Sequence, residues 1–188
     1  MSNLYFFFGD YDSKEFIEFI ATKIKNVIAV YPFNNSKFHN ASKIFLKTLD
    51  HNNLTKQCLN YTITDNNFEI LSLPQKYLRI FSLALERYAF HGLSPMYIEH
   101  KFENSVSFWI NEFTKNKTNF VVFDNVPHLP TEISAISALK LLKLPYIFKV
   151  AIALDYPSIY FWSDDIFKLQ QIELHSTNLN IKKTRNKI

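Results

Sequence analysis

The chain has 188 residues, a usual length for one domain with a sizeable hydrophobic core. Hydrophobic residues make up 47% of the sequence and aromatic residues 16%, whereas glycine occurs only twice, so bulky rings are expected to fill the core. The formal net charge is +4, but only Arg79, Arg87 and Arg185 among the 21 basic residues are arginines. Bidentate recognition of bases and phosphates favours arginine, so this composition argues against nucleic acid as a partner.

The sequence carries no apolar run of about 18 residues, the length that a membrane-spanning helix needs. Its first apolar run, residues 4–8, is too short for a secretion signal and is followed by Asp10 and Asp12. Cys58 is the only cysteine, which excludes an intramolecular disulfide and favours a reducing compartment. We therefore expect a cytoplasmic protein without a membrane span.

The first part of the chain predicts a βαβ unit. Residues 4–8 form a continuous apolar run, which is typical of a strand buried on both faces. Ser13 is a good N-cap for a helix over residues 14–25. A second apolar run, residues 27–31, is stopped by Pro32, so strand, helix and strand follow one another at the expected spacing.

The middle of the chain is dominated by helices. Residues 33–73 are either irregular or carry a third strand, with a weak helical period over 41–49 and a strand-like alternation over 60–65. A helix is expected from residue 74 to about residue 90, before Gly92. A longer helix begins at Ser94 and Pro95, and its apolar stripe consists of Ile98, Phe102, Val106, Trp109 and Phe113.

A second βαβ unit follows over residues 119–154. Its first strand stops at Asp124, a polar turn leads into a helix over 131–143, and the next strand covers 146–154. A short apolar run at 159–162 and a helix over 166–174 come after it. We predict an α/β fold with a Rossmann-like, open, mainly parallel sheet and helices on both faces, forming one domain over residues 1–175. Residues 176–188 are expected to be a disordered tail, made basic by Lys182, Lys183, Arg185 and Lys187.

This fold predicts the place of a site before any motif is named. In open parallel sheets, ligands bind beyond the carboxyl ends of the strands. The loops at those ends carry Asp10, Asp124, Asn125 and Asp155, our candidate ligand-binding residues, and His128, our candidate catalytic residue. Such a cleft suits a sugar or a metal held by carboxylates. Two alternatives stay open, since Asp and Asn are common in all loops and His128 could be a turn histidine bonded to the backbone.

The sequence lacks the common motifs for dinucleotides, for phosphate-binding loops, for hydrolase nucleophiles and for zinc proteases, so no cofactor and no metal is predicted. His128 lies at a helix N-terminus, where the helix dipole and free N–H groups favour an anion. Glu132 follows four residues later, but the intervening turn is expected to keep the two off a shared helical face.

A helical segment with Leu85-Glu-Arg-Tyr and an aromatic pair at Phe108-Trp109 precede a hydrophobic strand that ends in Asn125-Val-Pro-His128. Over roughly residues 75–165 this arrangement resembles a group of bacterial capsule and surface-polysaccharide biosynthesis proteins. The resemblance implies the N-terminal, Rossmann-like half of a GT-B glycosyltransferase, the half that usually faces the acceptor. In that architecture a second half, which mainly grips the nucleotide-sugar donor, would begin near the point where this chain ends.

Three hypotheses follow. The first is an acceptor-side domain for glycosyl transfer, with a nucleotide sugar or glycan as ligand, His128 as general base or phosphate-facing group, and a C-terminal domain supplied from elsewhere. The second is a non-catalytic, truncated α/β binding or interaction module that forms a homo-oligomer or binds a partner. The third is another α/β enzyme whose motif is not recognised, so whether the chain is an enzyme stays open.

Overall fold

The computed structural model of the chain describes residues 3–7, 26–31, 47–63, 70, 72–87, 92–152 and 159–166. Within these residues the elements are, in chain order, β1 (Asn3–Phe7), β2 (Asn26–Tyr31), β3 (Lys47–Asp50), α2 (His51–Leu59), α3 (Gln75–Arg87), α4 (Pro95–Lys115), β4 (Thr118–Phe123), α5 (Pro130–Leu142), β5 (Tyr146–Ile152) and β6 (Ile159–Ser163). None of the helices in this part of the chain is long and apolar enough to cross a membrane.

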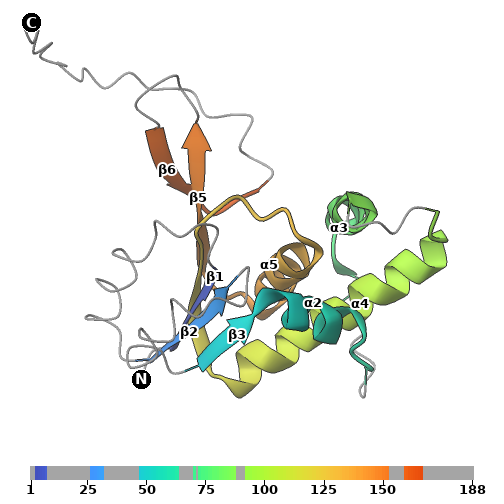
Figure 1. Cartoon of the computed structure of the whole chain (residues 1–188), viewed down its shortest axis with the longest axis horizontal. Helices are drawn as coiled ribbons and strands as arrows, with labels where there is room; N and C mark the ends of the chain where they lie inside the picture. The colour runs from blue at the N-terminus through green and yellow to red at the C-terminus, as the bar shows by residue number, and fades with distance from the viewer. Residues whose placement is uncertain are drawn as a thin grey trace, which may run out of the picture.

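The described strands form one sheet in the order β3-β2-β1-β4-β5-β6 (Figure 1). The pairs from β3 through β5 are parallel, and β6 pairs with β5 in the antiparallel direction. The chain moves outward from β1 to β3 on one side and then continues from β4 to β6 on the other. This is the order of a doubly wound sheet, so the predicted Rossmann-like α/β class is confirmed.

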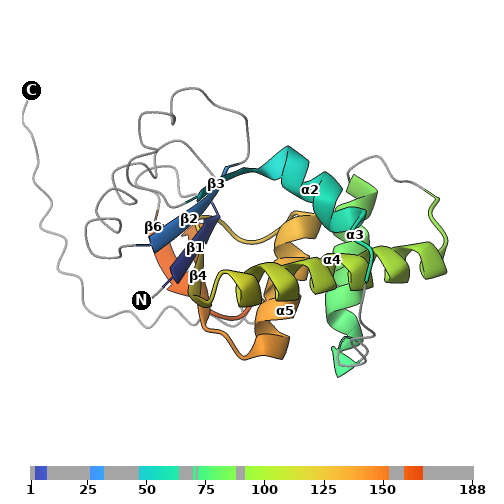
Figure 2. The ribbon, with the colours of Figure 1, turned by 90° about the horizontal axis from the view of Figure 1, so that it is seen from below.

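The core lies between the sheet and a layer formed by α2, α3, α4 and α5, which lie together on one face of the sheet (Figure 2). Alternate strand residues point into this layer: Tyr5, Phe7, Ile28, Val30, Val121, Phe123, Tyr146, Phe148 and Val150. The intervening residues Leu4, Phe6, Val27 and Val122 are buried as well, so the opposite face is also covered. The helix that we expect over residues 14–25 lies outside the described residues.

The longest helix, α4, forms as its sequence predicts. The Ser94 hydroxyl accepts a hydrogen bond from the Tyr97 N–H at 3.3 Å, and Pro95 occupies the first turn. Every residue of the predicted stripe is buried. At its centre the Trp109 ring stacks on Phe113, with centroids 5.1 Å apart, and meets Phe108 edge-on at 5.3 Å. Aromatic rings therefore do fill this core.

The middle of the chain contains the third strand that was one of the two predicted alternatives, but at another place. This strand is β3 at Lys47–Asp50, which overlaps the end of the stretch with a weak helical period, and α2 follows it directly. Residues 60–63 are neither helix nor strand, so the predicted strand over 60–65 is wrong for them, and 64–65 lie outside the described residues. The physical reason is that β3 is fixed by parallel pairing with β2, a tertiary interaction that a four-residue polar segment does not reveal.

The aromatic cluster gives the first testable prediction. Trp109→Ala should lower the free energy of unfolding by about 3–5 kcal/mol, because it removes a fully buried ring that contacts both α4 and β1. Asn111→Ala, on the exposed side of the same helix, serves as the control and should change stability by about 0.5 kcal/mol or less. Urea unfolding measures both, and equal losses would contradict the predicted role of Trp109 in the core.

Candidate functional site at the carboxyl edge of the sheet

The strand order reverses between β1 and β4, and their carboxyl ends lie side by side. Phe7 pairs with Phe123, and the Asp124 N–H then donates to the Phe7 carbonyl oxygen at 2.8 Å. The loop over residues 124–129 leaves this point and enters α5. A reversal of strand order opens a crevice in which doubly wound proteins bind their ligands. The loop that carries three of the predicted site residues is therefore at the expected place.

One side of this edge is bounded by a projecting hairpin. The last β4–β5 pair is Phe123 with Phe148, but β5 continues to Ile152 and β6 pairs with it over this whole extension. We call residues 149–152 and 159–162 the β5–β6 arm. In Figure 1 the arm stands beyond the ends of β1 and β2. The arm therefore projects from the same edge of the sheet as the 124–129 loop.

A buried ion pair ties the arm to the end of β4. Lys149 Nζ lies 2.6 Å from Asp124 Oδ1, and the two side chains are 27% and 2% exposed. Phe123 and Phe148 point into the helix layer, so the next residue of each segment lies on the opposite face of the sheet. The carboxylate of Asp124, a predicted ligand residue, is thus held inside the protein. Lys149 was missed by the sequence prediction, although it is the one charge in the apolar run of β5.

The side chains of Asn125 and His128, both in the 124–129 loop, are exposed to solvent. The Asn125 Oδ1 accepts a hydrogen bond from the Val126 N–H at 2.8 Å, a local turn contact. His128 Nδ1 lies 3.0 Å from the Val126 carbonyl oxygen. Because a carbonyl oxygen can only accept, Nδ1 carries the proton in this bond, and the lone pair of the neutral imidazole is on Nε2. The predicted alternative of a turn histidine bonded to the backbone is therefore correct for Nδ1, while the side chain remains 54% exposed.

Glu132 holds the same turn from inside. Its Oε2 accepts hydrogen bonds from the N–H groups of His128 at 2.9 Å and Leu129 at 3.0 Å. Leu129 is the N-cap of α5 and has no polar side chain, so Glu132 reaches back to satisfy the helix terminus. His128 lies in the turn before α5, so the expectation that the two residues share no helical face is confirmed. The turn nevertheless brings Glu132 Oε2 to 3.8 Å from His128 Nδ1.

The ionisation of Glu132 is set by opposing effects. Burial raises its pKa above the ordinary value of 4.5, while the two backbone hydrogen bonds and the neighbouring His128 act in the opposite direction. The Nε2 lone pair of the exposed His128 ring can accept a proton from a ligand at the surface of the loop, which is the chemistry of a general base.

The other candidate residues are placed differently. Asp10 and Asp155 lie outside the described residues. Within the described part of the chain, no group of three or more His, Cys, Asp or Glu side chains is arranged to hold a metal ion. Cys58 is buried, and burial raises its thiol pKa to about 12, which makes it unsuitable as a nucleophile. His128 is thus the described candidate whose side chain is both reactive and accessible.

No protein-family model, curated protein or solved structure matches this chain.

Glu132 gives a prediction about pH. Because its pKa is raised in the folded state, the folded protein binds this proton more tightly than the unfolded chain does, and the resulting stabilisation is lost as the pH rises above 4.5. Glu132→Gln keeps an acceptor for the backbone N–H groups but cannot ionise. Between pH 4.5 and neutrality its unfolding free energy should therefore fall less than that of the unsubstituted protein.

Urea unfolding at a series of pH values checks this difference. Glu132→Ala is the matched variant, since it cannot ionise and also removes the acceptor. It should be about 1–2 kcal/mol less stable than Glu132→Gln at every pH. Parallel pH profiles for the unsubstituted and Glu132→Gln proteins would contradict the assigned burial of the carboxyl group.

The ion pair between Lys149 and Asp124 gives a second prediction for this edge. Lys149→Met keeps the apolar stem but removes the cation beside a buried carboxylate, so it should cost about 3 kcal/mol. Lys115→Met, at an exposed position of α4, should change stability by about 0.5 kcal/mol or less. Adding Asp124→Asn to Lys149→Met should recover part of the loss, and a purely additive double variant in urea unfolding would disprove the coupling.

Proposed function

We propose that this chain is the acceptor-side domain of a glycosyltransferase-like protein in bacterial surface-polysaccharide synthesis, with His128 as its general base. The observation that carries the proposal is the orientation of the His128 ring. Its Nδ1–H is used by the Val126 carbonyl oxygen, so the basic Nε2 atom is the one available to a ligand. The side chain that presents Nε2 is exposed at the carboxyl edge of the sheet.

Two further features support the assignment. The fold is a Rossmann-like sheet with its strand order reversing beside the His128 loop, which is where such sheets bind ligands. The sequence Asn125-Val-Pro-His128, after a hydrophobic strand and before a helix, resembles surface-polysaccharide biosynthesis proteins. Neither feature names the sugar, but both favour the same loop.

The proposed step transfers a glycosyl group to an acceptor hydroxyl. Nε2 of His128 takes the hydroxyl proton as the acceptor oxygen forms a bond to the anomeric carbon of the donor. The bond from that carbon to the donor phosphate breaks, and the electron pair leaves with the nucleoside diphosphate. The resulting imidazolium is stabilised by Glu132, whose Oε2 lies 3.8 Å from Nδ1.

The surrounding residues would bind the acceptor. Asn125, exposed on the same loop, offers its amide to sugar hydroxyls, and the β5–β6 arm projects from the same edge of the sheet. Asp10 and Asp155 are proposed as further hydroxyl ligands. Asp124 contributes indirectly, since its ion pair with Lys149 fixes the arm against the end of β4.

A second function, a non-catalytic interaction module, is favoured by one observation away from this edge. A hollow of about 160 Å³ opens between α3 and α4, with an apolar floor formed by Ile70, Leu73, Leu78 and Phe102. A protein that serves only to bind a partner would use such a surface and would not need His128.

A ligand screen tests the proposed function. The protein is melted with nucleotides, nucleotide sugars and simple glycans, with His128→Ala and His100→Ala alongside; His100 is an exposed histidine on α4 and serves as the control. A glycan at about 100 Kd should stabilise the protein by about 2.7 kcal/mol, which raises Tm by about 5–10 °C for a chain of this size.

The proposal expects His128→Ala to reduce this shift strongly and His100→Ala to leave it unchanged. If a glycan binds equally well to both variants, His128 is not part of the site. If no sugar or nucleotide raises the Tm of the unsubstituted protein, the result favours the non-catalytic interaction module.

A further inference from the structure

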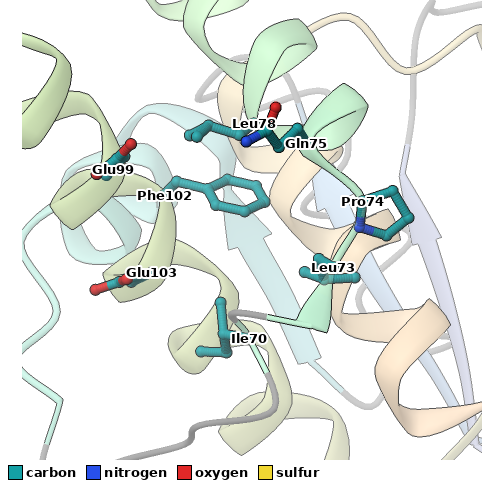
Figure 3. A pocket seen from close by; sticks show the side chains of 8 residues that line it. All are labelled: Ile70, Leu73, Pro74, Gln75, Leu78, Glu99, Phe102 and Glu103. Carbon is teal, nitrogen blue, oxygen red and sulfur yellow. The ribbon is translucent and has the colours of Figure 1, made fainter.

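The hollow between α3 and α4 has a composition that specifies a partner. Its lining residues come from the segment before α3, from α3 and from α4, and none belongs to a strand or to the 124–129 loop. Figure 3 shows Phe102 pointing across the hollow, with Leu78 above it and Ile70 below. Its volume of about 160 Å³ is close to that of an apolar cavity that holds benzene, roughly 150 Å³. One large apolar side chain therefore fits.

The rim of the hollow is acidic. Glu99 and Glu103 lie one turn apart on α4 and line its side, and the part of the lining that the structure describes contains neither lysine nor arginine. Within the described residues, neither glutamate takes part in an ion pair. The nearby cations are engaged elsewhere, since Lys101 Nζ donates to the Leu59 carbonyl oxygen at 2.8 Å and Lys76 lies over the Tyr77 ring. Among the described residues, the rim is thus a pair of carboxylates without an ion-pair partner, on a protein with a net charge of +4.

The surface continues along α4 beyond the hollow. Met96 precedes Glu99 by three residues and Glu103 by seven, so helical periodicity places it in the same row. Its side chain is 79% exposed, which is unusual for a large apolar residue. Met96 is flexible and polarisable, a property that suits contacts with a partner's apolar side chain.

We infer that the α3–α4 hollow is a docking site for a basic amphipathic peptide segment, which inserts one large apolar side chain and places lysine or arginine on Glu99 and Glu103. The apolar floor would supply most of the affinity. The two carboxylates would supply orientation and selectivity against acidic segments, because exposed charge pairs contribute little net affinity. This binding site is independent of the function proposed for His128.

The test uses three labelled synthetic helical peptides and fluorescence anisotropy. The first peptide alternates leucine and lysine at four-residue spacing, the second replaces lysine with glutamate, and the third replaces leucine with serine. Only the first should bind. The double substitution Glu99→Lys and Glu103→Lys should lower the affinity for the first peptide by about tenfold or more, because two attractive charge pairs become repulsive. Glu86→Lys, an exposed reversal on α3, is the matched control and should leave the affinity within about twofold.

A substitution in the apolar floor tests whether the peptide binds through the hollow and not only through its charge. Leu78 is half-exposed, so the Leu78→Gln protein should fold, which a thermal melt verifies. The substitution should weaken binding of the leucine–lysine peptide, but the protein should still prefer this peptide to the glutamate peptide. The inference is overturned if the leucine–lysine peptide fails to bind, or if Glu86→Lys weakens it as much as the double reversal does. It is also overturned if sedimentation shows a dimer that the double reversal dissociates, because the occupant would then be a second copy of the chain.

Discussion

The central strand β1 must satisfy hydrogen-bonding groups along both edges and bury side chains on both faces, and the rest of the structure is arranged to meet this demand. β2 and β4 supply parallel partners on its two edges. Tyr5 and Phe7 point into the helix layer, while Phe6 is fully buried on the other face. A strand that is paired on both edges forces the chain to build outward first on one side and then on the other. The strand order therefore reverses at the carboxyl ends of β1 and β4, the place where doubly wound sheets form a ligand-binding crevice.

The loop at this crevice is held by two buried acidic groups on different faces of the sheet. Asp124 is paired with Lys149, and Glu132 accepts two backbone hydrogen bonds at the start of α5. Buried charges are not an efficient way to gain stability, since well-packed apolar residues often do as well. What these groups provide instead is fixed geometry for a short polar loop. His128 lies between them in the chain and is held directly by Glu132, which accepts a hydrogen bond from its backbone N–H, so the loop suits chemistry at a defined point.

Sequence patterns predicted the parts of this structure that depend on local order. The stripe of α4 has the helical period. The apolar runs of β1, β2, β4 and β5 are short, continuous and bounded by turn residues, which is typical of buried strands. A third strand was one alternative for residues 33–73, but the position of β3 was not predicted, because its four residues are set by pairing with β2. At the site, the loop and His128 were predicted from the carboxyl-edge rule, but Lys149 and Glu132 were not. Both act through contacts made across the fold or around a turn, and a single lysine within a buried strand was the only hint in the sequence.

The helix α5 connects the two surfaces that we assign. It is buried throughout its first turns, its N-terminus carries the His128 loop, and its sides pack against α3 and α4. Close-packed interiors do not deform gradually, so a side chain that fills the α3–α4 hollow would have to move α5 as a body to disturb His128. The hollow is open in the structure and its floor includes no residue of α5. A ligand that fills existing space without displacing a helix leaves the His128 loop in the conformation that it already has. Binding at the hollow and chemistry at His128 are therefore separable properties of one fold, which is what allows each to be tested while the other is left intact.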